Sequence, residues 1–310
     1  SELRRRAKTR SAITLDAGLP SLSRQLRAGG LPMGARVVVA GPPGQGKTTL
    51  ALHFAETAAA AGWLVVWIAY DEPADRITAR RLQRLGVAPL DAAAIPLEEA
   101  ERLSGIEILD APGPPYETIA ELAAEEADGR PVMLVVDSVQ KLRTRAGADK
   151  AERERIDAAI DAVQECQVRF PAIVVMTSEI ARGTNATKGS GGIDYGATLA
   201  LRVKRSGTTL AVQITKNRDG SEEPFALEVD ADRQMLREPG AKGASVHRSE
   251  ARAAELWLRI QGALPARSGR ELVRKVGGKT DAIHACLPAH VASGESVKSC
   301  DGYALARGAE

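Results

Sequence analysis

The fold is decided by the stretch Gly41-Pro-Pro-Gly-Gln-Gly-Lys47-Thr48-Thr49. It follows the apolar run 37–40 and precedes a segment of helical character, 50–61. A strand, a glycine-rich loop and then a helix form the context in which the pattern G-x-x-x-x-G-K-[ST] binds phosphate. Glycines let the backbone turn its N–H groups toward an anion, and the new helix adds the positive end of its dipole. The sequence therefore predicts a nucleoside triphosphate site. A glycine-rich turn that matches by chance is the alternative.

Two side chains of this loop have distinct expected tasks. Lys47 is placed to reach the β- and γ-phosphates, and the Thr48 hydroxyl is placed to ligate Mg²⁺. The residues expected to bind the nucleotide are Gly41, Gly44, Gln45, Gly46, Lys47, Thr48 and Thr49.

Length and composition set broad bounds. The 310 residues suffice for one large domain and a small one, or for two of medium size. Apolar residues make up 44% of the chain and aromatic residues 3%, so the core is built from small aliphatic side chains, as in parallel α/β sheets. A net charge of +2 indicates no particular partner. The basic arm at residues 1–17 is either a solvated tail or a nucleic-acid contact.

The cysteines and the hydropathy pattern bear on the compartment. Cys166, Cys286 and Cys300 are far apart and form no C-x-x-C pair, which is typical of reduced thiols. No apolar run approaches the ~20 residues of a membrane span. The expectation is a cytoplasmic protein with no membrane partner.

The pattern of apolar runs predicts the fold class. Buried-type strands are expected at 64–70, 106–110, 132–136 and 172–176, alternating with helices at 50–61, 75–85, 116–127 and 150–170. Three strand-like runs follow without helices between them, at 197–205, 208–216 and 224–230. Alternating β and α that finishes as antiparallel β predicts an α/β domain over 18–237, with a mixed, mostly parallel sheet and helices on both faces.

The C-terminal region has a pattern of its own. Residues 238–250 read as a linker, and 251–310 predict three helices and a β-ribbon, the layout of a winged helix. If the segment 280–292 is the reading helix, a DNA major groove would meet Arg274, Lys279, Thr280 and His284, with Lys298 on the wing. Pro288 would kink that helix, and a protein is the alternative target.

Two acids follow predicted strands. Asp137 closes the run 132–136, where a carboxylate can hold magnesium through water, and its alternative role is a helix cap. Glu72 follows the run 64–70, at the strand end where α/β sheets place their sites. It is either the group that orients or deprotonates the attacking water, or a surface acid beside a turn proline.

Taken together, these motifs give the chain, from about residue 18 to 232, a resemblance to the RecA-like ATPases. It is most similar to the branch with the DnaB-type replicative helicases, the RadA/Sms proteins and the KaiC-like ATPases. The motifs, in order, are Gly18-Leu-Pro-Ser-Leu, Gly29-Gly-Leu-Pro-Met-Gly, the phosphate loop, Tyr70-Asp-Glu-Pro-Ala-Asp-Arg-Ile, Val136-Asp-Ser-Val-Gln, Thr177-Ser-Glu-Ile-Ala-Arg182, Lys188-Gly-Ser-Gly-Gly-Ile-Asp-Tyr195 and Thr215-Lys-Asn-Arg-Asp-Gly220.

The resemblance implies roles for individual residues. ATP and Mg²⁺ are the expected cofactors, with Lys47 and Glu72 as catalytic residues and Asp137 as the second acid around magnesium. Lys216 and Arg218 look like the pair inserted across a subunit interface to meet the neighbour's γ-phosphate, which makes hydrolysis depend on assembly. Their alternative is a pair of exposed charges at a strand end.

The chain departs from the DnaB-type pattern at two points. Glu179 stands where those helicases usually carry Gln, at the position that senses the γ-phosphate, so Glu179 is expected to turn away or to contact a partner. No segment of this sequence resembles the N-terminal domain through which DnaB-type helicases meet primase, and plasmid helicases of the RepA type lack that domain too.

The expected function is a homo-oligomeric, most simply hexameric, ATP-driven DNA motor or DNA-dependent ATPase. It would be a replication helicase or a RadA-like recombination factor, with a replication or recombination protein as a further partner. Single-stranded DNA would meet Arg182 and Lys188 in the loop after the strand 172–176, unless that loop is simply solvated. The alternative is a KaiC-like, nucleotide-controlled oligomeric switch that presents the winged helix to duplex DNA or to a protein.

Overall fold

A computed structural model describes residues 13–27, 29–84, 105–110, 113–147, 150–180, 192–230, 233, 235–239, 296–299 and 302–305. The chain divides into two compact units. Unit 1 comprises residues 1–82 and 89–241, and unit 2 comprises 83–88 and 242–310. The domain boundaries expected at 237 and 251 stay a prediction.

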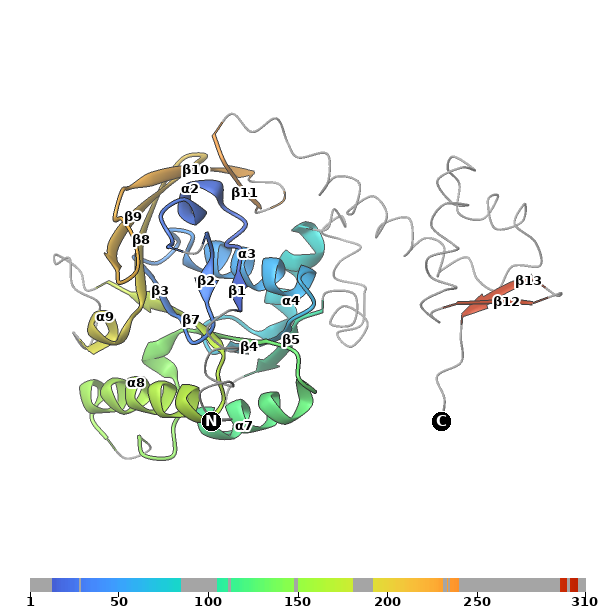
Figure 1. Ribbon diagram of the computed structural model, residues 1–310, viewed down its shortest axis with the longest axis horizontal. Coiled ribbons are helices and arrows are strands. Elements are labelled where there is room, and N and C mark those ends of the chain that lie inside the picture. Colours follow the sequence, from blue (N-terminus) through green and yellow to red (C-terminus); the bar gives the residue numbers. More distant parts are fainter. Residues whose placement is uncertain are drawn as a thin grey trace, which may run out of the picture. The chain divides into compact units, whose positions relative to one another are not determined.

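Unit 1 is built on one nine-stranded sheet with the strand order β11-β10-β9-β8-β3-β7-β6-β4-β5 (Figure 1). The strands are β3 (Arg36–Gly41), β4 (Leu64–Ala69), β5 (Glu107–Asp110), β6 (Val132–Asp137), β7 (Ile173–Glu179), β8 (Leu199–Ser206), β9 (Thr209–Asn217), β10 (Phe225–Asp230) and β11 (Met235–Arg237). The crossover from β3 to β4 skips the places of β7 and β6. In open α/β sheets a ligand binds at such a switch point, outside the carboxyl ends of the strands.

The sheet is mixed and mostly parallel, as the sequence predicts. β8, β3, β7, β6, β4 and β5 run parallel, whereas β9, β10 and β11 pair antiparallel. One expectation needs correction, because the antiparallel part was expected to include the run 197–205. β8 pairs parallel with β3 and antiparallel only with β9. The chain starts β8 at the amino edge beside β3, since Thr198 N donates to Arg36 O at 2.8 Å.

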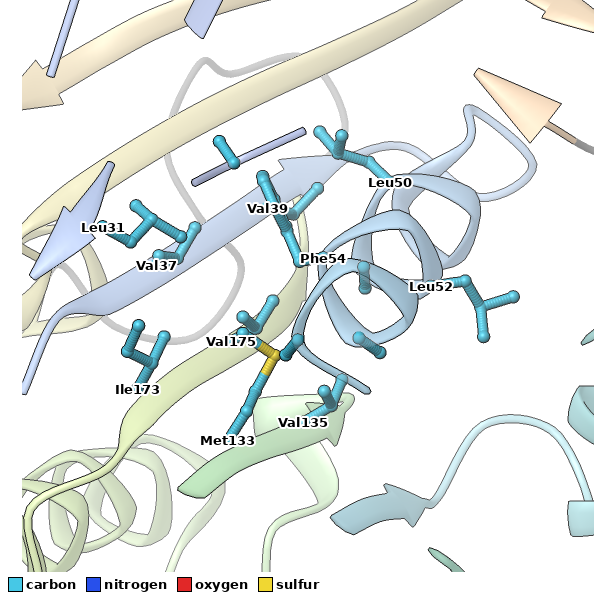
Figure 2. Packing of buried hydrophobic residues seen from close by; sticks show 14 of the residues in the cluster. Leu31, Val37, Val39, Leu50, Leu52, Phe54, Met133, Val135, Ile173 and Val175 are labelled. Carbon is cyan, nitrogen blue, oxygen red and sulfur yellow. The ribbon is translucent and has the colours of Figure 1, made fainter. Parts of the chain in front are cut away.

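Helices cover both faces of the sheet. Helices α3 (Lys47–Ala60) and α4 (Ala74–Arg84) contribute to one hydrophobic cluster, and α7 (Tyr116–Glu126), α8 (Glu152–Arg169) and α9 (Gly192–Gly196) to the other. Val37 and Val39 of β3 pack into the first cluster, whereas Val38 and Ala40 pack into the second. This alternation explains why the parallel strands are apolar at nearly every position. Figure 2 shows Phe54 of α3 and Val39, Val135 and Val175 of the sheet in the first cluster.

The lead-in segment packs on the α3 side of the sheet. It contains helix α2 (Pro20–Ser23), a short helix of the kind that the sequence predicts after the turn at Gly18. It also contains a two-stranded sheet of β1 (Thr14–Leu15) and β2 (Leu31–Pro32), and the sequence does not predict this sheet. Leu15, Leu22 and Leu31 are buried in the first cluster. After β6 comes the short 3₁₀ helix η1 (Val139–Lys141). None of the described helices combines the length and apolar character needed to cross a bilayer.

The described part of unit 2 includes a two-stranded ribbon. β12 (Ser296–Ser299) pairs antiparallel with β13 (Gly302–Leu305), where the sequence predicts one. Lys298 lies on β12 opposite Tyr303. The linker beyond residue 239 and the three helices expected at 253–264, 269–276 and 280–292 lie outside the described residues, as do Arg274, Lys279, Thr280 and His284. The winged helix therefore stays a prediction.

Candidate nucleotide site

The phosphate loop connects the end of β3 at Gly41 to the start of α3 at Lys47, as the sequence predicts. Gly46 caps the helix with φ 91°, a left-handed conformation that favours glycine. A Cβ on Gly46 would also lie 3.0 Å from Leu210 Cδ1, so the site has little room for a side chain. The backbone N–H groups at the start of α3 open toward the carboxyl edge of the sheet, where a helix N-terminus favours an anion.

Lys47 is the buried cation of the loop. Only 9% of its surface is exposed, and Nζ donates to Pro42 O at 3.1 Å. Burial lowers the pKa of its ammonium group, whereas neighbouring carboxylates, Glu179 first among them, act to raise it. A partly desolvated ammonium group interacts more strongly with phosphate oxygens than a solvated one does.

Asp137 ends β6 and is 2% exposed. It accepts hydrogen bonds from Thr48 Oγ1 at 3.1 Å and from Thr177 Oγ1 on β7. Burial is the main cause of its raised pKa, and these hydroxyl donors oppose the rise. A carboxylate bonded to a threonine hydroxyl supplies the hard oxygen atoms that Mg²⁺ prefers. Among the described residues, no group of three or more His, Cys, Asp or Glu side chains could hold a metal ion.

Glu72 follows β4 at the same edge of the sheet. Its Oε1 forms an ion pair with Arg80 Nη2 of α4 at 2.8 Å. Its Oε2 is buried and accepts no hydrogen bond from the described residues. The end of β4 is tied to β6, because Tyr70 N and Asp71 N both donate to Asp137 O, at 2.7 and 3.0 Å. Glu72 and Asp137 are thus held near each other, and the charge of Glu72 contributes to the raised pKa of Asp137.

Gln45 and Glu179 flank the loop. Gln45 Oε1 accepts a hydrogen bond from Arg205 N at 2.9 Å, which ties the loop to β8. Glu179 ends β7 in register with Gly41, and its negative charge acts on Lys47. The sequence analysis expects Glu179 to turn away or to contact a partner. It does not predict the electrostatic interaction of Glu179 with Lys47 of the same chain.

Lys216 lies near the end of β9, and Arg218 directly follows that strand. Lys216 Nζ and Arg218 Nη2 both donate to Tyr195 O, at 2.7 and 3.2 Å. The ammonium group also lies 5.6 Å from the centre of the Tyr195 ring, which is 81% exposed. Arg218 is close enough to lower the pKa of Arg36. The pair therefore sits at the amino edge of β3, away from the phosphate loop of the same chain.

Other predicted residues have less definite positions. Thr49 is buried in the first turn of α3, and Gly44 lies in the exposed part of the loop. Arg182 and Lys188 lie outside the described residues, so their contact with DNA stays a prediction.

The sequence analysis missed three partners of the site: Thr177, Arg80 and Tyr195. Thr177 stands directly after an apolar run in a strand beside that of Asp137, which was a usable signal. Arg80 lies eight residues after Glu72 on the predicted helix, so its contact depends on how α4 packs. Tyr195 contributes a backbone oxygen, which every residue type has, so the sequence carries no signal for this contact.

Comparison with solved structures finds proteins of a similar fold. A solved ATPase domain is 16% identical and covers 76% of this chain and 96% of its own length, with a TM-score of 0.63. A DnaB-like replicative helicase is 17% identical and covers 72% of this chain and 61% of its own length, with a TM-score of 0.62. A KaiC-like protein from Pyrococcus horikoshii OT3 is 20% identical and covers 73% of this chain and 98% of its own length, with a TM-score of 0.55. The fold and the phosphate loop define a P-loop ATPase of the RecA-like class.

The sequence comparisons add the family. Residues 2–182 match the family model described as AAA domain, AAA_25, and the chain belongs to that family. Protein RecA of Bartonella bacilliformis is 29% identical over 204 residues, which are 63% of this chain and 55% of that protein. Protein RecA of Blastochloris viridis is 29% identical over 203 residues, with the same two shares. The chain thus spans about half the length of these curated relatives.

Proposed function

We propose that the protein is a homo-oligomeric, ring-forming ATPase that works as a DNA motor or DNA-dependent ATPase, with ATP bound between subunits. The supporting observation is the distance along the sheet between the phosphate loop and the pair Lys216 and Arg218. This distance supports a role for the two charges at the nucleotide of another subunit rather than at that of their own chain.

The strand register gives that distance. Arg218 N donates to Thr198 O, and Thr198 N donates to Arg36 O, so Arg218 lies level with Arg36 at the first residue of β3. The phosphate loop starts at Gly41, five residues further along the same strand. At about 3.3 Å per residue the two are separated by ~16 Å along the strand, and Arg218 is also two strands away. A neighbouring subunit that stacks its carboxyl edge on this amino edge would receive both charges at its γ-phosphate.

The chemistry follows from the side chains at each edge. Thr48 and Asp137 would hold Mg²⁺, which would supply positive charge to offset that of the phosphates. Lys47 binds the phosphates from its own chain. Glu72 orients the attacking water and accepts its proton through the carboxylate that Arg80 holds. Arg218 from the neighbour, with Lys216 beside it, stabilises the charge that grows on the transferred phosphoryl group.

A subunit-mixing experiment tests the shared site. Arg218→Ala should retain nucleotide binding and lose turnover by about 10³-fold or more, because an arginine supplied in trans can contribute 10³–10⁵ in rate. Glu72→Gln should also be inactive, since it cannot take the proton from water. Mixing the two inactive variants should restore turnover, because a Glu72→Gln subunit lends an intact Arg218 to the intact site of its neighbour.

The control variant is Arg153→Ala, an exposed arginine on α8. It should turn over ATP like the wild type, alone or in mixtures. If the two inactive variants co-assemble, as judged by native mass, and no activity returns, the shared site is wrong.

The choice between motor and switch rests on nucleic acid. A motor that draws Arg182 and Lys188 along a strand should show ATPase strongly stimulated by single-stranded DNA in a ring-sized assembly. The second candidate is the KaiC-like oligomeric switch, which the separate unit 2 with its β12–β13 ribbon favours. The switch should hydrolyse ATP slowly and ignore single strands, while duplex DNA or a partner protein binds through unit 2.

A further inference from the structure

The loop that follows β9, residues 217–223, is folded around Gln25. The Gln25 side chain comes from the lead-in segment after α2 and is only 9% exposed. Its Nε2 donates to Glu223 O at 2.9 Å, and its Oε1 accepts from Glu223 N at 2.8 Å. The side-chain amide thus pairs with both backbone groups of Glu223, as a neighbouring strand would. Ser221 Oγ adds a third, longer bond to Oε1, at 3.3 Å.

The main chain of Gln25 holds the rest of the loop. Gln25 O accepts hydrogen bonds from Asn217 Nδ2 at 3.0 Å and from Ser221 N at 3.2 Å. Gly220 forms an isolated antiparallel bridge with Leu26. A Cβ on Gly220 would lie 1.7 Å from Gln25 O, so only glycine permits this close approach. Gln25 therefore contacts both ends of a loop whose middle is exposed.

Arg218 lies inside the segment that Gln25 closes. The loop is anchored to β8 by Arg218 N, which donates to Thr198 O at 3.1 Å. Gln25 is itself fixed, because its Nε2 also donates to Ser21 O at 3.1 Å. Ser21 in turn donates to both oxygens of Glu238, from N at 2.7 Å and from Oγ at 2.6 Å. The support for the loop thus comes from residues about 200 positions away in the chain.

We propose that Gln25 is a positioning residue for ATP hydrolysis, because it fixes the loop that presents Arg218 to the neighbouring subunit's γ-phosphate. The inference rests on the proposed role of Arg218. It adds a residue that touches neither nucleotide nor the reacting atoms, and it acts at the site of the neighbour rather than at its own.

The size of the effect follows from the exposure of the loop. Asp219, Gly220, Ser221 and Glu222 are exposed, so without the Gln25 side chain they would be restrained only by the loop's own bonds, the bonds to Gln25 O and the bridge to Leu26. A displacement of about 1 Å at a catalytic group can cost ~10²-fold in rate. Loss of the Gln25 side chain should therefore reduce turnover by about 10- to 100-fold, less than loss of the Arg218 guanidinium itself.

The test is steady-state ATPase of Gln25→Ala, with nucleotide binding measured on the same sample. We expect kcat to fall by about 10- to 100-fold while KM for ATP and nucleotide affinity stay within about twofold of wild type, because the phosphate loop is untouched. Mixing with Glu72→Gln subunits should restore turnover, as it should for Arg218→Ala. A merely destabilised or locally damaged subunit would not be rescued by a partner whose own site is dead.

Two more variants keep the outcome decisive. Gln25→Glu retains the oxygen that accepts from Glu223 N but loses both donors, so its kcat should lie between wild type and Gln25→Ala. It also answers the question if Gln25→Ala does not fold. Ser23→Ala is the matched control, since its hydroxyl donates to Asp16 at 2.8 Å and not to the loop, and it should behave like wild type.

The two possible failures are distinguishable. Wild-type kcat in Gln25→Ala and Gln25→Glu, with Arg218→Ala inactive and rescued by Glu72→Gln, would overturn the role of Gln25 and leave the proposed function intact. Unimpaired turnover in Arg218→Ala would instead remove the proposed function itself, and the role of Gln25 with it.

Discussion

The parallel and antiparallel halves of the sheet are built from different surfaces. All six residues of β4 and of β6 are buried, since helices pack on both of their faces. In β9, by contrast, Leu210, Val212 and Ile214 are buried while the residues between them are exposed. These two parallel strands are thus enclosed within the subunit, whereas the antiparallel strand β9 keeps one face toward solvent.

This difference separates two kinds of chemistry. A strand buried on both faces offers its polar groups chiefly at its carboxyl end, where Asp137 meets Thr48 and Thr177. These groups serve a ligand of the same chain. A strand with an open face can carry charged side chains toward solvent, and Lys216 and Arg218 lie at and just beyond the end of β9. In the proposed function, the parallel half binds the nucleotide and the antiparallel half acts on the nucleotide of a neighbouring subunit.

The largest expected effect compares one lysine from each half. Lys47→Ala should abolish nucleotide binding and turnover, because it removes the phosphate-binding cation of the site. Lys216→Ala should leave nucleotide binding within about twofold of wild type and lower only turnover, because its ammonium group serves another subunit. Equilibrium binding of a fluorescent ATP analogue and steady-state ATPase give both readouts. Equal loss of binding in the two variants would contradict the division between the halves.

Charge substitutions test the packing difference next. Val65→Glu and Val66→Glu on β4 should each lower the free energy of unfolding by about 3–5 kcal/mol, because both faces of the strand are buried and the charge is left without a partner. On β9 only Val212→Glu should do so, whereas Ala211→Glu should stay within about 0.5 kcal/mol. Urea unfolding of the four variants measures this pattern. Severe destabilisation by Ala211→Glu would mean that the open face of β9 is covered.

The smallest expected effect concerns the hydrogen bond between the phosphate loop and β8, the parallel strand that pairs with the antiparallel half. Gln45→Ala removes the acceptor for Arg205 N and should lower the free energy of unfolding by about 1 kcal/mol, since one ordinary hydrogen bond is lost. Nucleotide affinity should change by less than about threefold. Thermal unfolding and the same binding assay check both. A tenfold loss of affinity with unchanged stability would show instead that Gln45 contacts the nucleotide directly.

The sequence predicted the features that depend on local chemistry. A strand, a glycine-rich loop and a lysine together are typical of a phosphate site. The loop from Gly41 to Thr49 could therefore be predicted without knowledge of the fold. Two apolar runs, each followed by an acidic residue, predicted the strands before Glu72 and Asp137. The same reasoning found the mixed sheet, because periodicity records which faces are buried.

Other features were decided by the packing of distant segments. Nothing near Gln25 indicates that its amide pairs with Glu223, 198 residues later, and nothing in the run 197–205 says that β8 lies parallel to β3. The sequence indicated Lys216 and Arg218 as a candidate pair. Their separation from the phosphate loop becomes known only when the strands are placed in register. By itself the sequence determined which groups form the phosphate loop, because neighbouring residues supply them. Only the tertiary structure decided which edge of the sheet each group occupies, because that depends on hydrogen bonds between strands far apart in the chain.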